Sequence, residues 1–179
     1  MKDFLELVKA RQSDRAYDMT RDVEPEKLER VLEAARLAPS ACNAQPWKFV
    51  AITDKELSKE VGKATAGLGM NKFAKDAPVQ ILVVEESANI TSLLGGTVKN
   101  KHFPLIDVGI AAAHITLAAE SEGLGSCILG WFDEKKIKSL TGIPAGKRLL
   151  LVITIGYSVK PKRPKLRKEK SKVISFNKY

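Results

Sequence analysis

Two clusters of side chains, at opposite ends of the 179-residue chain, have the residue types that bind phosphate. A guanidinium group can bind two phosphate oxygens at once, and a lysine adds a compact positive charge. The residues are Arg11, Gln12, Ser13 and Arg15 near the N-terminus and Lys165 and Arg167 near the C-terminus. Taken singly, such arginines are more often ordinary surface charges. Together, the two clusters favour a ligand that carries a phosphate group.

Most of the net charge lies in one segment of the chain. The formal net charge is +9, and eight Lys or Arg against one Glu between residues 160 and 172 supply +7 of it. The remainder carries +2 and is nearly neutral, which argues against a nucleic-acid surface spread over the whole protein. A basic segment of this kind can hold a phosphate, bind an anionic partner or form a solvated tail.

Residue types for other chemistries are sparse. Two histidines and two cysteines are too few for a His-rich metal site or a disulfide framework. A Gly-x-Ser-x-Gly motif is absent, and the segment that begins at Gly123 lacks the third glycine of a dinucleotide-binding loop. We expect His114 to be a core histidine and Cys127 a buried thiol with a raised pKa, whereas Cys42 falls in a loop. We therefore assign no catalytic residue and no metal site.

Hydrophobic periodicity and turn residues predict alternating helices and strands without repeats or a linker. The expected helices are residues 4–12, 25–38, 55–63, 105–122 and 134–141, and the expected strands are 47–53, 79–84, 126–129 and 149–155, with 173–176 as an added edge strand. Residues 87–104 have no clear period and are expected to be a mobile excursion. The pattern indicates one α/β or α+β domain over residues 1–179, in which 158–179 form a basic C-terminal extension.

Two of the expected helices have apolar faces. The first face comprises Leu28, Val31, Leu32 and Ala35, and the second comprises Ile106, Ile110, Ala113 and Leu117. Because the second helix has so little charge, we expect it to be largely buried. A signal peptide is not apparent, and apolar residues nowhere run on for about 18 positions, so we expect an intracellular protein without a membrane span.

Several motifs occur in the order found in one family of flavoproteins. Residues 39–47 read Pro-Ser-Ala-Cys-Asn-Ala-Gln-Pro-Trp, which resembles the signature of the nitroreductase-type, FMN-dependent oxidoreductases almost letter for letter. The matching segments that accompany it are Arg11-Gln12-Ser13-x-Arg15, residues 107–111, 123–130, 142–144 and 155–157. The resemblance therefore covers nearly the whole chain.

The resemblance implies an α+β fold with a mixed, mostly antiparallel central sheet flanked by helices. It further implies an intertwined homodimer with one FMN at each subunit interface. The phosphate and ribityl chain would be held by Arg11, Gln12, Ser13, Arg15, Lys165 and Arg167. The flavin of the partner subunit would be reached by Pro39, Ser40 and Asn43. Asn71 or its neighbour Lys72 would lie near the flavin ring, and the backbone of Leu129 and Gly130 would face its reactive edge. Leu129 replaces a glutamate that is frequent in the family, so no side-chain role is expected there.

The expected function is that of a cytoplasmic oxidoreductase. FMN would accept a hydride at N5 from NADH or NADPH and pass electrons to a small nitroaromatic or quinone-like acceptor, which requires no dedicated acid or base on the protein. One alternative keeps the fold but changes the flavin reaction to reductive dehalogenation or flavin fragmentation. A second alternative is a module that binds nucleic acid or another anionic partner through the basic extension.

Overall fold

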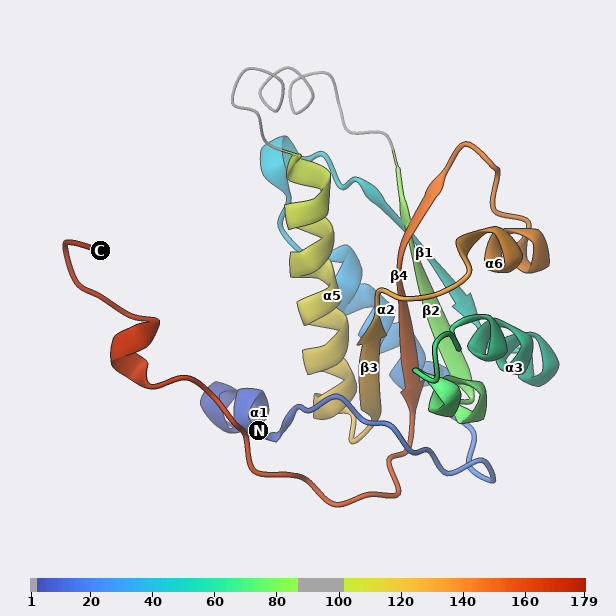
Figure 1. Ribbon diagram of the computed structural model, residues 1–179, viewed down its shortest axis with the longest axis horizontal. Coiled ribbons are helices and arrows are strands. Elements are labelled where there is room, and N and C mark those ends of the chain that lie inside the picture. The colour runs from blue at the N-terminus through green and yellow to red at the C-terminus, as the bar shows by residue number, and fades with distance from the viewer. Residues whose placement is uncertain (1–2, 87–101) are drawn as a thin grey trace.

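The computed structural model describes residues 3–86 and 102–179 (Figure 1). Its centre is a four-stranded sheet in the order β1-β2-β4-β3, and every neighbouring pair of these strands is antiparallel. The strands are β1 (Trp47–Ile52), β2 (Val79–Glu85), β3 (Gly125–Leu129) and β4 (Arg148–Gly156). β3 is therefore an edge strand, and this position decides where the candidate site lies.

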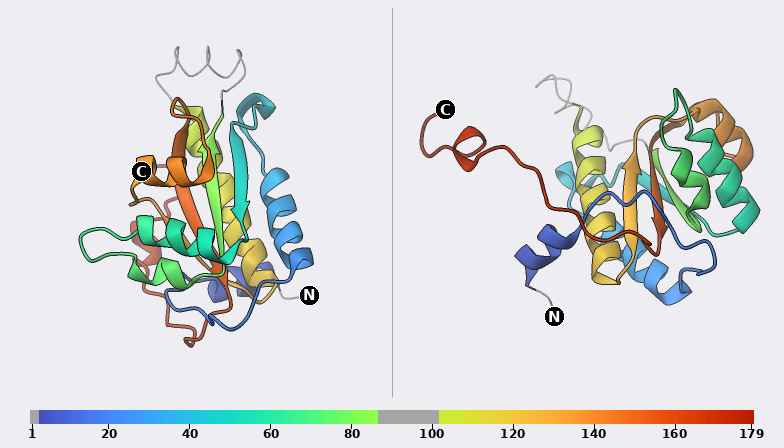
Figure 2. Two further views of the ribbon diagram at one scale, coloured as in Figure 1. Left: turned by 90° about the vertical axis from the view of Figure 1, so that its right-hand side faces the viewer. Right: turned by 60° about the horizontal axis from the view of Figure 1, so that its bottom comes forward.

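Helices cover both faces of the sheet (Figure 2). On one face lie α2 (Pro25–Arg36) and α5 (Phe103–Ser121), and on the other lie α3 (Lys55–Ala64) and α6 (Glu134–Thr141). β2 shows why two cores form, because its side chains alternate between them. Ile81 and Val83 pack in the α2/α5 core, whereas Leu82 and Val84 pack in the α3/α6 core. The expected α+β class with an antiparallel sheet is confirmed.

Local sequence signals set the helix boundaries as expected. Pro25 occupies the first turn of α2, where its missing N–H is not needed. The carboxylates of Asp54 and Asp133 accept hydrogen bonds from Leu57 N–H (2.8 Å) and Lys136 N–H (3.0 Å), and so begin α3 and α6. Each of the nine expected helices and strands before residue 157 is found within about two residues of its predicted bounds, a margin that is usual for element ends.

The two ends of the chain leave the body on the same side (Figure 1). α1 (Phe4–Ala10) exposes all its residues to some degree, and the C-terminal extension runs past it and ends away from the sheet. The predicted edge strand at 173–176 is wrong. This segment follows a short 3₁₀ turn, η3 (Lys170–Lys172), and Phe176 is 82% exposed. A strand needs a neighbour to pair with, and the extension has moved beyond the sheet edge at this point.

α5 turns the predicted core face outward. Val108, Ala111 and Ile115 pack against the sheet, whereas Ile106 is 53% exposed and Ala113 also faces out. α5 is long and apolar enough to cross a membrane by length and composition alone, but half of it is buried within the fold, as in the core helix of a globular protein. The expectation of a largely buried helix therefore fails for the single chain. Of the predicted excursion at 87–104, residues 87–101 lie outside the described residues.

Candidate functional site: the open edge of β3

An N-terminal arm, residues 11–18, covers the beginning of the edge strand β3. Ser13 and Ser126 form a parallel bridge, and the backbone N–H of Asp14 donates to the carbonyl of Ser126 (2.9 Å). Further along, Tyr17 pairs with Ser158, and its hydroxyl lies 2.6 Å from Thr154 Oγ1 on β4. The arm therefore places Arg11, Ser13 and Arg15 beside the first residues of β3.

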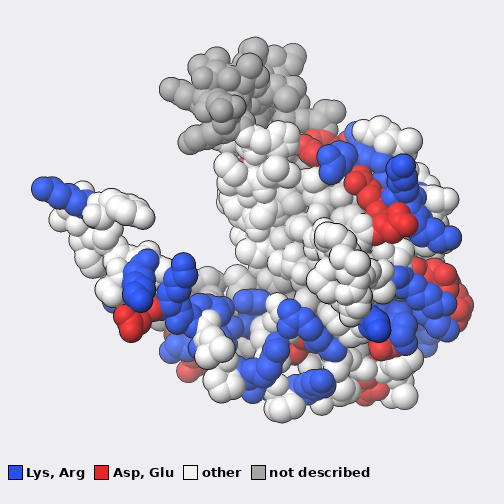
Figure 3. Space-filling model, viewed as in Figure 1, with Lys and Arg blue, Asp and Glu red and all other residues white. Residues whose placement is uncertain are grey.

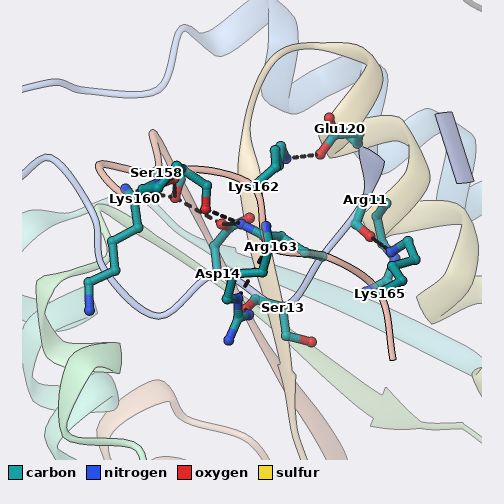
Figure 4. A network of polar contacts seen from close by, with 11 residues as sticks. Arg11, Ser13, Asp14, Glu120, Ser158, Lys160, Lys162, Arg163 and Lys165 are labelled. Atoms are coloured by element: carbon teal, nitrogen blue, oxygen red, sulfur yellow. Dashed lines mark hydrogen bonds and ion pairs between the residues drawn. The ribbon is translucent and has the colours of Figure 1, made fainter. Parts of the chain in front are cut away.

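The C-terminal extension crosses this arm and is bonded to it (Figure 4). Lys165 Nζ donates to the carbonyl of Arg11, and Arg163 Nη2 donates to the carbonyl of Ser13 (2.7 Å). Lys162 forms an ion pair with Glu120 near the end of α5 at 2.5 Å. Although 154 positions separate Lys165 from Arg11, the fold brings the two predicted phosphate-binding clusters together.

The charges at the crossing repel one another. Partial burial lowers the pKa of Lys165 below its ordinary value, and the nearby positive charges of Arg11, Arg167 and Lys162 lower it further, against an opposing effect of Glu120. A group of cations that depresses a lysine pKa in this way is stabilised by an anion. Figure 3 shows the Lys and Arg side chains continuing along the extension beyond the body. The crossing thus gathers positive charges from both ends of the chain.

The charged and polar groups that act on the Cys127 thiol show that Arg15 lies close to β3. Burial raises the pKa of the Cys127 thiol, as expected from the sequence, while the charge of Arg15 and a hydrogen bond from Ser13 oppose that rise. Arg15 and Ser13 therefore lie close to the middle of β3. A buried thiol with a raised pKa is a poor nucleophile, so Cys127 has a packing role here.

Beyond the arm, none of the residues that the structure describes pairs with the outer edge of β3. Successive residues of a strand turn their backbone groups to opposite edges. The carbonyl of Ser126 points outward to the arm, whereas the carbonyl of Cys127 points inward to β4, where it accepts a hydrogen bond from Thr154 Oγ1 (3.3 Å). The same alternation turns the backbone groups of Ile128 to the outer edge, and β3 ends one residue before Gly130. At about 3.3 Å per residue, Gly130 lies roughly 13 Å from Ser126.

The backbone of Gly130, just past the end of β3, faces open space. A Cβ atom added at Gly130 would meet nothing within 4 Å. The next residue, Trp131, has a half-exposed ring that packs so closely on Gly67 that a Cβ there would lie 2.5 Å from Nε1. Asn71 has a positive φ of 57° and donates from Nδ2 to the carbonyl of Trp131 (3.1 Å). Of the two candidates Asn71 and Lys72, Asn71 is therefore the one bonded beside Gly130.

The loop with Pro39, Ser40 and Asn43 lies at the other end of α5. Its short turn η1 (Ala41–Asn43) is held by a hydrogen bond from Ala41 N–H to the Asp107 carboxylate (3.1 Å). Asp107 and Glu120 are thirteen residues apart on α5, or about 20 Å at 1.5 Å per residue. Within one chain, the loop and the arm are thus at separate places. That the loop serves a partner's flavin stays a prediction.

Sequence reasoning missed the residues that join the arm to the extension. Asp14 stood as the variable position between Ser13 and Arg15, and Arg163 and Ser158 were counted only within the basic extension. Asp14 is buried and accepts from Ser158 Oγ (2.8 Å), and Arg163 N–H donates to Gln12 Oε1 (3.1 Å). The only signal in the sequence was an acidic residue placed between two arginines. Gln12 is bonded to Asp14 and to the extension, and its predicted contact with the ligand stays a prediction.

Comparison with known proteins identifies the family. The model of the nitroreductase family matches residues 8–69 and 65–157. A putative NADH dehydrogenase/NAD(P)H nitroreductase of Archaeoglobus fulgidus is 30% identical over 165 residues, which cover 88% of this chain and 86% of that protein. An iodotyrosine deiodinase of Thermotoga neapolitana is 27% identical over 190 residues, covering 92% and 95%.

Solved structures agree with this result. An FMN-dependent nitroreductase from Clostridium difficile R20291 superposes with a TM-score of 0.78 and 29% identity, covering 98% of this chain and 100% of that one. The chain belongs to the nitroreductase family.

Proposed function

We propose that this protein is an FMN-dependent oxidoreductase that takes a hydride from NADH or NADPH and reduces small nitroaromatic or quinone-like acceptors. The observation that carries the proposal is the crossing of arm and extension, because it gathers cations at the start of an open strand edge. The names of the relatives support the same class of reaction. Bound FMN would supply the hydride and electron transfer, and the protein would supply binding and orientation.

The described residues fit FMN in their donor types. Arg11, Arg15 and Lys165 would neutralise the phosphate, with Arg167 completing the positive field around Lys165. Ser13 would add a hydroxyl donor. Leu129 and Gly130 would contribute backbone, and the N–H of Gly130 would donate to the reactive edge of the ring. Asn71 would fix this turn through its bond to the carbonyl of Trp131.

We further propose a homodimer, in the cytoplasm, with a flavin at each subunit interface. Two apolar surfaces of the single chain support a partner: the outward face of α5, where Leu105 and Ile106 are each 53% exposed, and α1, where Phe4 and Leu5 are 63% and 62% exposed. Apolar surface of this extent is normally covered in a stable protein. A dimer would also bring the Pro39–Asn43 loop of one chain to the site of the other.

The likeness to an iodotyrosine deiodinase keeps reductive dehalogenation as a second candidate reaction. It uses the same cofactor site, so the choice depends on the acceptor. Binding of nucleic acid through the extension is less well supported, because Lys162 and Arg163 have partners within the fold.

The test is a spectrum of the purified protein followed by anaerobic titration with each nicotinamide. We expect a flavin absorbance band that is bleached by NADH or NADPH and restored by a nitroaromatic or a quinone. If an iodinated phenol restored the flavin absorbance and released iodide, while a nitroaromatic did not restore it, the reaction would be reductive dehalogenation. Failure of the protein to bind FMN even at saturating concentration would refute the proposal.

A further inference from the structure

Asp14 is a buried carboxylate at the contact between the arm and the extension. It is 2% exposed, and its Oδ1 accepts hydrogen bonds from Gln12 Nε2 (2.8 Å) and Ser158 Oγ (2.8 Å). Its backbone N–H binds Ser126, and its carbonyl accepts from the Tyr17 hydroxyl (3.1 Å). One residue thus joins the arm, the extension and the edge of the sheet.

Gln12 connects this carboxylate to the extension. Its Nε2 group donates to Asp14 Oδ1 (2.8 Å) and also to the carbonyl of Pro161 in the extension (3.5 Å). The other end of the amide, Oε1, then points to the extension and accepts from Arg163 N–H (3.1 Å) and Arg163 Nε (3.4 Å). Arg163 in turn donates to the carbonyl of Ser13 (2.7 Å). The chain of bonds therefore runs from Asp14 to the segment that carries Lys165 (Figure 4).

The local packing is fitted to this carboxylate. A Cβ atom added at Gly125 would lie 2.9 Å from Asp14 Oδ2 and 3.0 Å from Asp14 Cβ, so a side chain at Gly125 would displace Asp14. Oδ2 is buried and has no hydrogen-bond partner among the described residues. An unsatisfied buried oxygen has a cost in stability, and Asp14 is tolerated there because Oδ1 organises both neighbouring segments.

We propose that Asp14 is a positioning residue, which orients Gln12 and holds the extension against the arm so that Lys165 and Arg11 meet the same phosphate. The inference rests on the proposed function for its ligand. Asp14 itself does not contact the phosphate, since its negative charge would weaken binding of an anion.

The first measurement needs no ligand. Hydrogen exchange in the apo protein reports the extension through the amide of Arg163, which donates to Gln12, and that of Val159, which donates to Ala16. In Asp14→Ala these amides should exchange about tenfold faster, the effect of losing a hydrogen bond of typical net strength. Ser158→Ala, which removes one bond without a large cavity, should give a smaller increase at the same amides. The matched control is Asp107→Ala, which removes another buried carboxylate, about 20 Å along α5 from Glu120, and should leave these amides unchanged.

The second measurement compares FMN with riboflavin, which lacks the phosphate. Asp14→Ala should weaken FMN binding about tenfold and leave riboflavin binding nearly unchanged, because only the phosphate depends on the crossing. Asp14→Asn keeps one oxygen acceptor and removes the charge, so it should bind FMN within about twofold of the wild type. Equal losses for FMN and riboflavin would mean that Asp14 acts through general stability, which overturns the proposal.

Unchanged exchange at Arg163 and Val159 in Asp14→Ala would also overturn it. Tighter FMN binding in both Asp14 variants would show that the charge of Asp14 matters and its bonds do not, which is a third contrary result. If the wild type binds neither flavin, the proposed function fails, and the exchange measurement still decides whether Asp14 holds the extension.

Discussion

Lys165 gives the sharpest test of the phosphate site, through the substitution Lys165→Ala. Its ammonium group donates to the carbonyl of Arg11 and lies in the positive field of Arg11, Arg167 and Lys162. A charge-assisted hydrogen bond contributes about 1.5–3 kcal/mol. Because Lys165 is only half-buried, we expect the lower end, which corresponds to about a tenfold loss of FMN affinity.

The same site predicts how FMN affinity depends on pH. The pKa of Lys165 is lowered in the free protein, whereas a bound phosphate would raise it, since an opposite charge favours the protonated form. Binding should therefore take up a proton at alkaline pH. FMN affinity should fall as the pH rises through the lowered pKa of the free protein, and this fall should be absent in Lys165→Ala.

The assay is a fluorescence titration of FMN and of riboflavin at a series of pH values. Riboflavin shares the titrating ring and lacks the phosphate, so it separates ring effects from those of Lys165. Lys160→Ala is the matched control, because Lys160 is exposed and its side chain extends away from the crossing (Figure 4). A surface charge of this kind contributes at most about 1 kcal/mol. If Lys160→Ala and Lys165→Ala weakened FMN binding equally, the extension would attract FMN only through its overall positive charge, and the assigned phosphate site would be wrong.

Two further predictions concern assembly and stability. Ile106→Lys places a charge on the outward face of α5 and should shift sedimentation from dimer to monomer; a flavin-loaded wild-type monomer would contradict the proposed interface. Gly62→Ala should destabilise the fold by about 1–3 kcal/mol in urea unfolding, because its Cβ would lie 2.5 Å from Lys75 Cα, a backbone atom. Gly146→Ala, with nothing within 4 Å of its Cβ, is the control, and equal midpoints for the two variants would refute the packing argument.

Elements with a strong periodic pattern could be predicted from the sequence. α2 shows this well: Leu28, Val31 and Ala35 recur at helical spacing, and all three are buried. The outward face of α5 could not be predicted, because both sides of that helix are apolar and periodicity alone does not say which side meets the sheet. The edge strand at 173–176 failed for a related reason, since apolar residues such as Ile174 and Phe176 are equally suited to a partner surface.

The candidate site was predictable only in part. The family resemblance assigned Arg11, Ser13 and Lys165 to one phosphate, but no sequence pattern showed which residues join the two ends of the chain. That connection depends on Asp14, whose role comes from burial and from the groups around it. A single Asp between Ser13 and Arg15 has no periodic or motif signal, so only the three-dimensional contacts show what it does.

The open edge of β3 also explains why residue types alone did not indicate a catalytic group. An edge strand exposes a row of backbone groups, which proteins usually cover. Here the arm covers the edge only near Ser126, and no described segment forms a backbone ladder with this edge at Ile128. Backbone donors at fixed positions suit a cofactor that carries out the chemistry itself. In the proposed function the side chains have the simpler task of anchoring the charged end, which we assign to Arg11 and Lys165, with Asp14 holding them in position.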